Sequence, residues 1–284
     1  MMLRTLAMLI CLAGAPLVAD ASQKVSLAAT TSGPRLSSHS VAVVDAESGQ
    51  LVYEKNANQI QPFASITKLM TAMVTLDANL PLDDSITISD DEVDRIKRTT
   101  SRLAVGSTLS RHEMLLLALM SSENRAAASL ARTYPGGKAA FIAQMNRKAK
   151  SLGMHNTEFH DATGLDVRNT STAMDLVRMV KAAYNYPLIR QFTTTAEYDA
   201  HPRGNRVLHY KNSNPLVREG VWDIALSKTG YIEEAGRCLV MQTMVGSQRM
   251  IMVLLDANGS AARVNDAKSI KTWLEAHPNT WLSG

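Results

Sequence analysis

Hydrophobic residues recur along the chain with two different periods, and the period changes past the middle. Apolar residues follow the three-to-four-residue spacing of a helix from Ser65 to about Ala78, and again after about Arg111. The segments 137–152 and 172–184 have the same spacing. After Pro187, short β-rich runs replace this pattern, separated by Gly, Asn and charged residues that favour turns. We expect strands at 206–210, 224–228, 238–245 and 250–255.

The two ends of the folded region complement each other. Two β-rich runs, 41–44 and 51–53, flank a turn at 47–50 and predict a hairpin. A final amphipathic helix is expected from about Ala262 to Leu274. The simplest assembly pairs the hairpin with the C-terminal strands. We therefore predict an α/β (α+β) fold, in which an antiparallel sheet is flanked by terminal helices and carries an inserted, mostly helical lobe.

The N-terminal segment has the form of a cleaved secretory signal. Arg4 precedes an apolar run, Leu6 to Leu12, which is too short to span a bilayer and is followed by small residues. We expect cleavage after Ala21; the alternative is an uncleaved anchor. The predicted organisation is a signal peptide at 1–21, a flexible polar leader at 22–38, a catalytic domain at 39–276 and a short tail at 277–284.

Composition narrows the class of protein. A chain of 284 residues with 45% hydrophobic residues can bury a substantial core. Its formal charge of +4 is unchanged by loss of the signal, which removes Arg4 and Asp20. The mildly basic balance favours contact with anionic cell-surface polymers. No dense run of Lys and Arg with interleaved aromatic residues is present, so we expect no nucleic-acid partner.

Cysteine and histidine patterns argue against redox or metal chemistry. Cys11 lies in the signal, so the exported protein keeps only Cys238, which we expect to be a small core residue on a strand. The seven histidines form no H-E-x-x-H string. His155 and His160 lie in a predicted loop without carboxylate or cysteine partners at ligand spacing. We expect no metal and no cofactor.

The string Ser65-Ile66-Thr67-Lys68 supplies a nucleophile and a base. Residues three apart share a face of a helix, and a lysine whose pKa is lowered by burial can take a proton from a serine. A serine at a helix start also has a backbone N–H and the positive end of the helix dipole where an oxyanion would form. Taken alone, the string is weak, because a lone S-x-x-K is far more often a capping serine with a solvated lysine.

Two further strings supply what such a site lacks. Ser122-Glu123-Asn124 follows the second predicted helix as a turn, where Ser122 can relay a proton and Asn124 can hold a substrate amide or the lysine. Lys228-Thr229-Gly230 ends a β run. Its lysine and threonine suit a substrate carboxylate, and its glycine lets a backbone approach closely. Each string alone also fits an ordinary turn or strand end; their ordered occurrence together favours one acyl-transfer site.

In this order the three strings resemble the signature of penicillin-binding proteins and class A β-lactamases. The chain resembles low-molecular-mass penicillin-binding proteins from about Ser37 to Leu274. The stretches 64–73 and 115–128 are similar to the D-alanyl-D-alanine endopeptidase branch, the penicillin-binding protein 7 type. This resemblance implies a β-lactamase/transpeptidase-like fold and a periplasmic serine DD-peptidase.

The resemblance also implies roles for single residues. Ser65 would attack the D-alanyl carbonyl of a peptidoglycan stem peptide and form an acyl-enzyme. Backbone N–H groups of Ser65 and Tyr231 would bind the oxyanion, and Lys68 with Ser122 would pass the proton to the leaving amine. In the endopeptidase branch, that amine belongs to a cross-bridging diaminopimelate. Water would then cleave the acyl-enzyme.

Substrate binding is implied for four other residues: Asn124, Lys228, Thr229 and Gly230. Lys228 and Thr229 would hold the carboxylate beside the scissile bond. The expected partners are peptidoglycan stem peptides, with β-lactams as inhibitors because they present a strained amide beside a carboxylate. The relatives' C-terminal amphipathic anchor is not expected, so we predict no stable membrane anchor.

Two departures from class A β-lactamases disfavour that activity. Glu123 replaces their aspartate, and the loop Asp161–Leu165 lacks their deacylating glutamate. Two alternatives to an endopeptidase stay open. One is a D-alanyl-D-alanine carboxypeptidase that trims terminal D-alanine with the same residues. The more remote one is a non-catalytic peptidoglycan- or penicillin-binding protein. Such a binder would not need all five of the residues present here: Ser65, Lys68, Ser122, Asn124 and Lys228.

Overall fold

The computed structural model describes residues 33–202, 206–259 and 261–278. The expected signal peptide, the first part of the leader and the end of the tail lie outside these residues. Within the described part, Ser37 and Ser38 are already tied to the fold. The carboxylate of Asp266 accepts hydrogen bonds from both backbone N–H groups, at 3.0 and 2.7 Å, and from the Ser38 hydroxyl. Contacts with the fold thus begin before residue 39, since the Leu36 carbonyl also accepts a hydrogen bond from Lys55 at 3.2 Å.

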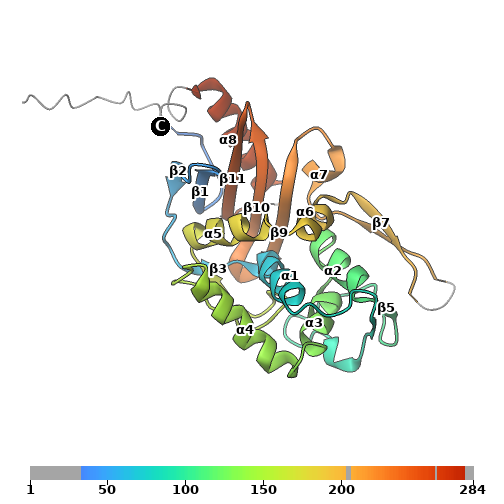
Figure 1. The fold of residues 1–284 in the computed structure, drawn as a ribbon. Helices are drawn as coiled ribbons and strands as arrows, with labels where there is room; N and C mark the ends of the chain where they lie inside the picture. Colours follow the sequence, from blue (N-terminus) through green and yellow to red (C-terminus); the bar gives the residue numbers. More distant parts are fainter. Residues whose placement is uncertain (1–32, 203–205, 260, 279–284) are drawn as a thin grey trace, which may run out of the picture. The chain divides into compact units, whose positions relative to one another are not determined.

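A five-stranded antiparallel sheet joins the two ends of the folded chain, as the hydrophobic pattern predicts (Figure 1). Its strand order is β2-β1-β11-β10-β9. The register of the central pair sets Val43 opposite Met252. The strands are β1 (Ser40–Asp45), β2 (Leu51–Lys55), β9 (Ile224–Ile232), β10 (Gly236–Val245) and β11 (Gln248–Ala257).

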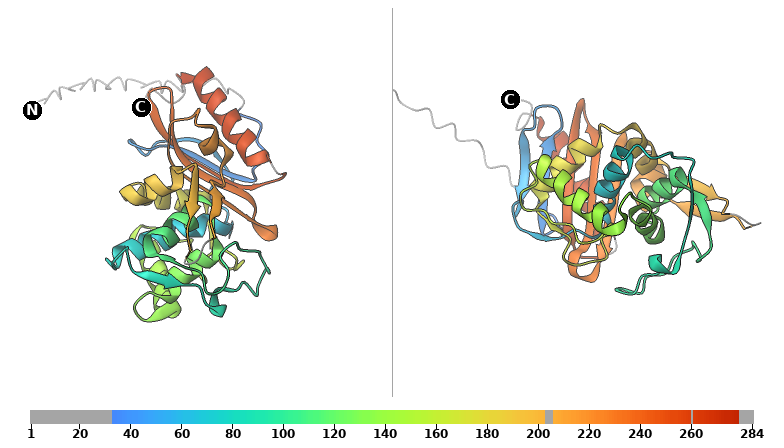
Figure 2. Two further views of the ribbon diagram at one scale, coloured as in Figure 1. Left: turned by 90° about the vertical axis from the view of Figure 1, so that its right-hand side faces the viewer. Right: turned by 60° about the horizontal axis from the view of Figure 1, so that its bottom comes forward.

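Strict alternation along these strands builds two cores, one on each face of the sheet. Val41 and Val43 point to the face covered by α8 (Ala262–Ala276), where Ile270 and Leu274 are fully buried. Ala42 and Val44 point to the opposite face, which packs on the helical lobe. The left view of Figure 2 shows α8 on one side of the sheet and the helical lobe on the other.

The inserted lobe is mostly helical, as expected. Its α5 lies on the sheet and contacts β1, β10 and β11. The helices are α1 (Lys68–Asp77), α2 (Arg111–Met120), α3 (Asn124–Arg132), α4 (Gly137–Ser151), α5 (Ala173–Ala183), α6 (Pro187–Thr194) and α7 (Pro215–Glu219). Short 3₁₀ helices are η1 (Ala64–Thr67), η2 (Asp90–Glu92) and η3 (Glu233–Ala235).

Three of these helices and three small two-stranded sheets are absent from the sequence prediction, except for β8 (Leu208–Lys211), which was expected as a strand at 206–210. Proline at the first helical position starts both α6 and α7, although Pro187 was expected only to mark the end of the helical region. The α3 helix begins within the expected turn at Asn124. The two-stranded sheets pair β3 (Gln61–Pro62) with β6 (Thr170–Ser171), β4 (Ser85–Thr87) with β5 (Thr108–Ser110), and β7 (Glu197–Ala200) with β8 (Leu208–Lys211).

Cys238 lies on β10 and is fully buried and unpaired, as the expectation of a small core residue requires. Burial raises the pKa of its thiol to about 12. A thiol that is protonated and shielded from solvent is a poor nucleophile. Cys238 therefore serves packing.

Candidate active site

The amine of Lys68 lies at the centre of the site. Its Nζ is 2.8 Å from the Ser65 Oγ, 2.8 Å from the Asn124 Oδ1 and 2.7 Å from the backbone carbonyl oxygen of Thr163. The side chain has no exposed surface. Nucleophile, base and amide are therefore brought together as the sequence predicts, and a carbonyl joins them that the sequence analysis did not name.

Burial makes this lysine a usable base. Loss of hydration lowers the pKa of Lys68 from 10.5 to about 7, although the negative charges of Asp161 and Glu123 act in the opposite direction. In the neutral amine, two hydrogens can go to the amide and carbonyl oxygens, which leaves the lone pair for the hydroxyl proton of Ser65. The three contacts thus orient the base toward its nucleophile.

Ser65 lies in the 3₁₀ turn that leads into α1, one turn earlier than a plain helix start. Neither η1 nor α1 has a side-chain cap, so the alternative role of Ser65 as a capping residue does not apply. The preceding Ala64 has a φ of 49°, in the left-handed region. Ser65 itself retains 9% of its surface exposed, which leaves the hydroxyl accessible next to a fully buried amine.

The Ser122 string forms a tight junction between α2 and α3. Ser122 has a φ of 63°, and Glu123 caps α3 by accepting a hydrogen bond from the N–H of Arg125. Asn124 is therefore the first helical residue rather than part of a free turn. The Ser122 Oγ accepts a hydrogen bond from Lys228 Nζ at 3.0 Å. The proton-relay serine and the second lysine are in contact, as expected.

The Lys228 string lies in the middle of β9 and does not end it, which corrects the sequence prediction. The strand continues to Ile232, and Thr229 pairs with Leu239 across the ladder. Thr229 Oγ1 donates to the hydroxyl of Ser213 at 2.7 Å. Gly230 packs against η1: a Cβ there would lie 3.0 Å from the Ser65 backbone nitrogen. Glycine at this position is what brings the strand to the nucleophile.

Lys228 is as buried as Lys68, with 1% of its surface exposed. Desolvation, the nearby Lys68 and then Arg263 lower the pKa of Lys228 well below 10.5. Arg263, on α8, donates to the Gly230 carbonyl at 2.7 Å and was not singled out from the sequence. The charged form of Lys228 is thus disfavoured by its surroundings, and an anionic group bound beside it would favour that form.

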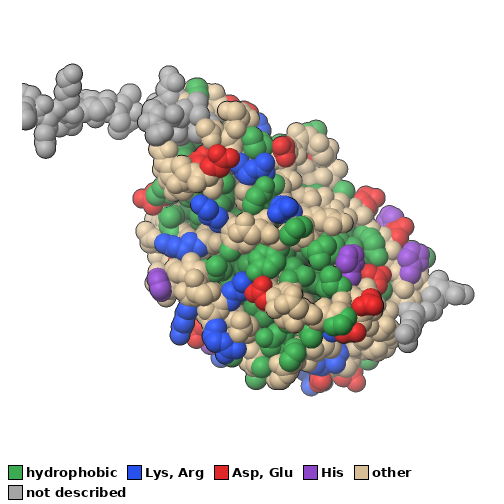
Figure 3. Space-filling model, in the orientation of Figure 1, with side chains coloured by type: hydrophobic (Ala, Val, Ile, Leu, Met, Phe, Trp, Pro, Cys, Tyr) green, Lys and Arg blue, Asp and Glu red, His purple; other side chains and the backbone are tan. Residues whose placement is uncertain are grey.

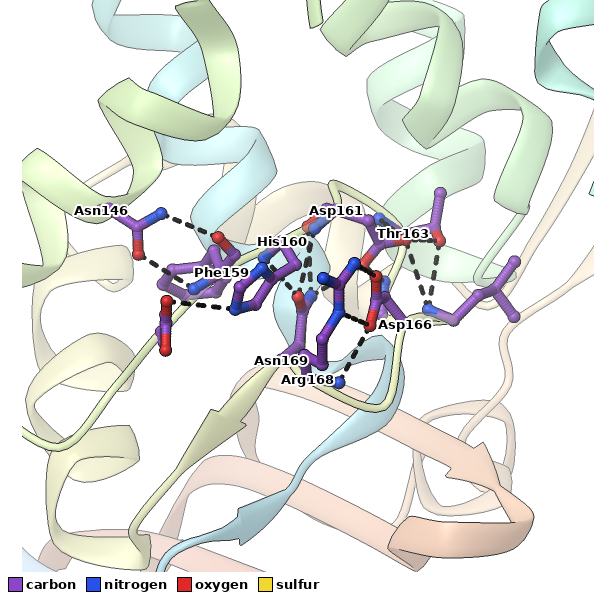
Figure 4. A network of polar contacts seen from close by, with 11 residues as sticks. Asn146, Phe159, His160, Asp161, Thr163, Asp166, Arg168 and Asn169 are labelled. Carbon is purple, nitrogen blue, oxygen red and sulfur yellow. Dashed lines mark hydrogen bonds and ion pairs between the residues drawn. The ribbon is translucent and has the colours of Figure 1, made fainter. Parts of the chain in front are cut away.

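A buried polar loop holds the carbonyl that Lys68 contacts. The carboxylate of Asp161 accepts hydrogen bonds from the N–H groups of Thr163 and Gly164, at 3.1 and 2.9 Å, and from the Thr163 hydroxyl. Asn169 Nδ2 donates to Asp161 Oδ1 at 2.8 Å and to Thr67 Oγ1 at 3.0 Å. Figure 4 shows these side chains facing one another inside the loop. The network joins the loop to η1.

Gly164 locks this loop onto the nucleophile's turn. It has a φ of 83°, and a Cβ there would lie 2.0 Å from the Ala64 carbonyl oxygen. Only glycine fits such an approach. From its sequence, this loop was considered only because it lacks a glutamate. Its Asp-x-Thr-Gly pattern, which is typical of a turn capped by a side chain, was the signal that could have identified the buried turn.

Tyr231 follows Gly230 on β9, with 55% of its surface exposed and the Arg237 guanidinium 4.5 Å from its ring centroid. Its predicted role concerns only its backbone N–H. Among the described residues, no cluster of three or more His, Cys, Asp or Glu side chains could hold a metal ion. No helix in the described ranges is long and apolar enough to cross a membrane.

A serine hydroxyl beside a buried amine, with a second amine and an amide around it, is the arrangement that a serine acyl-transfer enzyme with a lysine base requires. Comparison with known proteins places the chain within one family. The model of the peptidase S11 family, described as D-alanyl-D-alanine carboxypeptidase, matches residues 27–259. The chain belongs to this family and is a serine DD-peptidase.

Two curated relatives are similar over most of their length. D-alanyl-D-alanine endopeptidase of Escherichia coli K12 is 46% identical over 261 residues, which cover 92% of this chain and 84% of the relative. D-alanyl-D-alanine endopeptidase of Pseudomonas aeruginosa is 49% identical over 243 residues, which cover 84% of this chain and 78% of the relative. Among solved structures, the Streptomyces K15 DD-transpeptidase aligns with a TM-score of 0.80 at 30% identity, covering 86% of this chain and 99% of that one. The β-lactamase/transpeptidase-like fold is confirmed.

Proposed function

We propose that this protein is a penicillin-sensitive serine D-alanyl-D-alanine endopeptidase, which hydrolyses the D-alanyl–diaminopimelate cross-links of peptidoglycan. The observation that carries the proposal is the fully buried Lys68 amine 2.8 Å from the Ser65 hydroxyl, in a chain similar to endopeptidases. The cross-link as substrate follows from the resemblance to the endopeptidase branch, and the geometry of the site supports the role proposed for each residue.

Acylation begins when neutral Lys68 takes the hydroxyl proton and Ser65 attacks the D-alanyl carbonyl. The backbone N–H groups of Ser65 and Tyr231 bind the resulting oxyanion. The close approach of Gly230 to η1 supports this pairing, because it sets the strand that carries Tyr231 beside the nucleophile.

The leaving amine then takes a proton from Ser122, which is replaced by the proton that Lys68 took from Ser65. Lys228 donates a hydrogen bond to the Ser122 hydroxyl, and Asn124 accepts one from Lys68, so both groups beside the relay are held in place. The C–N bond breaks, the amine leaves, and the acyl group stays on Ser65. Attack by water, with Lys68 again as the base, releases the peptide and restores the enzyme.

The side of the site formed by β9 binds the carboxylate next to the scissile bond. Lys228 and Thr229 offer a cation and a hydroxyl, and Gly230 allows the substrate backbone to approach the strand. Asn124 can direct its amide to a substrate carbonyl or amide. A β-lactam offers the same pair of groups, an amide beside a carboxylate, and would acylate Ser65. No cofactor enters any step.

A D-alanyl-D-alanine carboxypeptidase is the second candidate. It would use the same residues on a terminal D-alanine, and the family model itself carries that description. The high identity to endopeptidases over most of the chain favours cross-links as the substrate. A secretory signal at residues 1–21 and peptidoglycan as the partner together imply a periplasmic enzyme.

One experiment separates these activities. The mature protein and its Ser65→Ala variant are incubated with labelled penicillin and, separately, with cross-linked muropeptide dimers, and products are resolved by mass. We expect the wild type to be labelled and to convert dimers to monomers, and the variant to do neither. Labelling of the variant would refute Ser65 as the nucleophile. Loss of a terminal alanine with dimers left intact would identify a carboxypeptidase.

A further inference from the structure

An ion pair joins the two sides of the molecule close to the site. Lys97 Nζ contacts Glu234 Oε1. Lys97 belongs to the segment between η2 and β5 in the helical lobe, whereas Glu234 lies on η3, where β9 ends. Neither residue has a part in the reaction described above.

Lys97 is linked to the catalytic lysine by a short chain of hydrogen bonds. The Asp94 carboxylate accepts the N–H of Lys97 at 3.0 Å and the N–H of Thr99 at 2.8 Å, which closes a compact turn. Thr99 Oγ1 accepts a hydrogen bond from Asn124 Nδ2 at 3.1 Å, and Asn124 Oδ1 contacts Lys68. The turn that carries Lys97 is therefore positioned by the same amide that orients the base.

Glu234 is placed by the opposite wall. Glu234 lies four positions after Gly230 in the chain, and β9 is the last strand in the order of the described sheet. A peptide that adds to the edge of β9 runs along the strand. If its carboxylate lies at Lys228 and Thr229, its acyl-donating part extends past Tyr231 toward Glu234.

A cavity of about 280 Å³ lies on the lobe side of this path. Its lining combines the segment 90–96 with Asn124 and Thr163, both of which contact Lys68. Space for a side chain is thus available beside the residues that precede Lys97, although Lys97 and Glu234 do not themselves line this cavity.

The ion pair can exchange its partners at little cost. The side chains of Lys97 and Glu234 are 27% and 41% exposed, and such pairs stabilise a fold by only about 0–1 kcal/mol. A ligand group that carries an ammonium and a carboxylate on one carbon would give each side chain a new partner. One ion pair would be replaced by two of the same kind.

We propose that Lys97 and Glu234 form a subsite for a zwitterionic amino-acid end, the free end of the diaminopimelate in the acyl-donating stem peptide. Lys97 binds its carboxylate and Glu234 its ammonium. This inference rests on the proposed function, because it requires a stem peptide along β9. In this subsite the pair selects the acyl-donating stem peptide and takes no part in the cleavage of the bond.

The test compares two synthetic cross-linked dimers, one with diaminopimelate in the donor peptide and one with lysine, which lacks the second carboxylate. We expect the wild type to prefer the diaminopimelate dimer about tenfold in kcat/KM, which is the contribution of one ion pair to the binding of a ligand. The Lys97→Gln variant should cut both dimers at the same kcat/KM. Lys211→Gln, in the exposed Lys211–Glu197 pair of the β7–β8 hairpin, is the matched control and should keep the preference.

A charge exchange distinguishes a subsite from a structural tie. The double variant Lys97→Glu, Glu234→Lys keeps an ion pair but reverses the charges that face the ligand. We expect it to lack the preference while penicillin acylates it at the wild-type rate. An unchanged preference in Lys97→Gln, or its recovery in the double variant, would overturn the subsite. Acylation by penicillin with neither dimer cut would instead refute the proposed function.

Discussion

The two walls of the site hold their catalytic groups by different means. On the wall formed by the helical lobe, Lys68 is held by side chains and one carbonyl, and that carbonyl depends on the buried network of Asp161 and Asn169. On the wall formed by the sheet, Lys228 and Thr229 are held by the backbone ladder of β9 with β10. The polar wall should therefore be sensitive to single side-chain changes, whereas the sheet wall should tolerate them.

The apolar core lies beyond both walls. In Figure 3, green side chains gather in the middle of the visible face, over the region where α1, α2 and α6 meet, and charged groups lie mostly around them. Beneath this surface, the helices that carry the polar wall pack in a core where Leu69 and Leu117 are fully buried. The sensitivity of this wall therefore comes from its buried hydrogen bonds.

The largest effect is expected at Lys68. The Lys68→Met variant keeps the volume of the side chain but removes the base, so the rate of acylation by labelled penicillin should fall about 10³-fold or more. Lys211→Met, at an exposed position on β8, is the control and should acylate normally. A less than tenfold loss would mean that another group takes the Ser65 proton.

Gly164→Ala tests the junction between the loop and η1. The new methyl group would meet the Ala64 carbonyl at 2.0 Å, so we expect a loss of about 3 kcal/mol or more in the free energy of unfolding, with acylation slowed as well. Gly153→Ala is a matched control. Gly153 also has a positive φ, 72°, but its nearest neighbour is the flexible Arg178 side chain at 3.9 Å. Equal losses in both variants would show that backbone strain alone, not the contact, is responsible.

The pH dependence of acylation should report the base of the polar wall. Because burial lowers the pKa of Lys68 to about 7, the neutral amine is the minor form below that pH and the major form above it. We expect the second-order rate constant for penicillin to rise about tenfold per unit below pH 7 and then to level off. A profile that is flat between pH 5 and 7 would contradict a lysine base with this pKa.

The smallest effect is expected on the sheet wall. Ser213→Ala removes the hydroxyl that accepts from Thr229, but the backbone ladder should hold Thr229 in place. We expect a loss of about 1 kcal/mol in the free energy of unfolding, measured by denaturant titration. The rate of acylation, measured by penicillin labelling, should fall less than tenfold. Asn169→Ala on the polar wall, measured in parallel, should lose about 2 kcal/mol or more, because it leaves buried groups without partners. If the two losses are equal, the contrast between the walls fails.

The sequence predicted those elements whose formation depends on residues close together in the chain. The terminal hairpin, the C-terminal strands and the helix after Ser65 follow from periodicity, and the Ser65–Lys68 contact follows from helical spacing. The ordered strings then identified the catalytic groups. Their arrangement in one site is a property of the fold that no single string contains.

The support of the site was missed for a physical reason. The contact of Lys68 with the Thr163 carbonyl spans 95 residues, and that of Asn169 with Thr67 spans 102, so no window of sequence holds both partners. The strand β9 was expected to end at the Lys228-Thr229-Gly230 string. It continues because the glycine is used for close approach to Ser65, a demand that arises only from packing.

The buried amine of Lys68 also affects folding. In the unfolded chain its pKa returns toward 10.5, so between about pH 7 and that value the unfolded state binds more protons than the native state. Stability contributed by this group therefore increases as the pH rises through this window, and the full penalty of burying the charge applies below it. The burial that prepares Lys68 as a base thus makes this group's own contribution to stability smallest on the acidic side, where its amine is protonated.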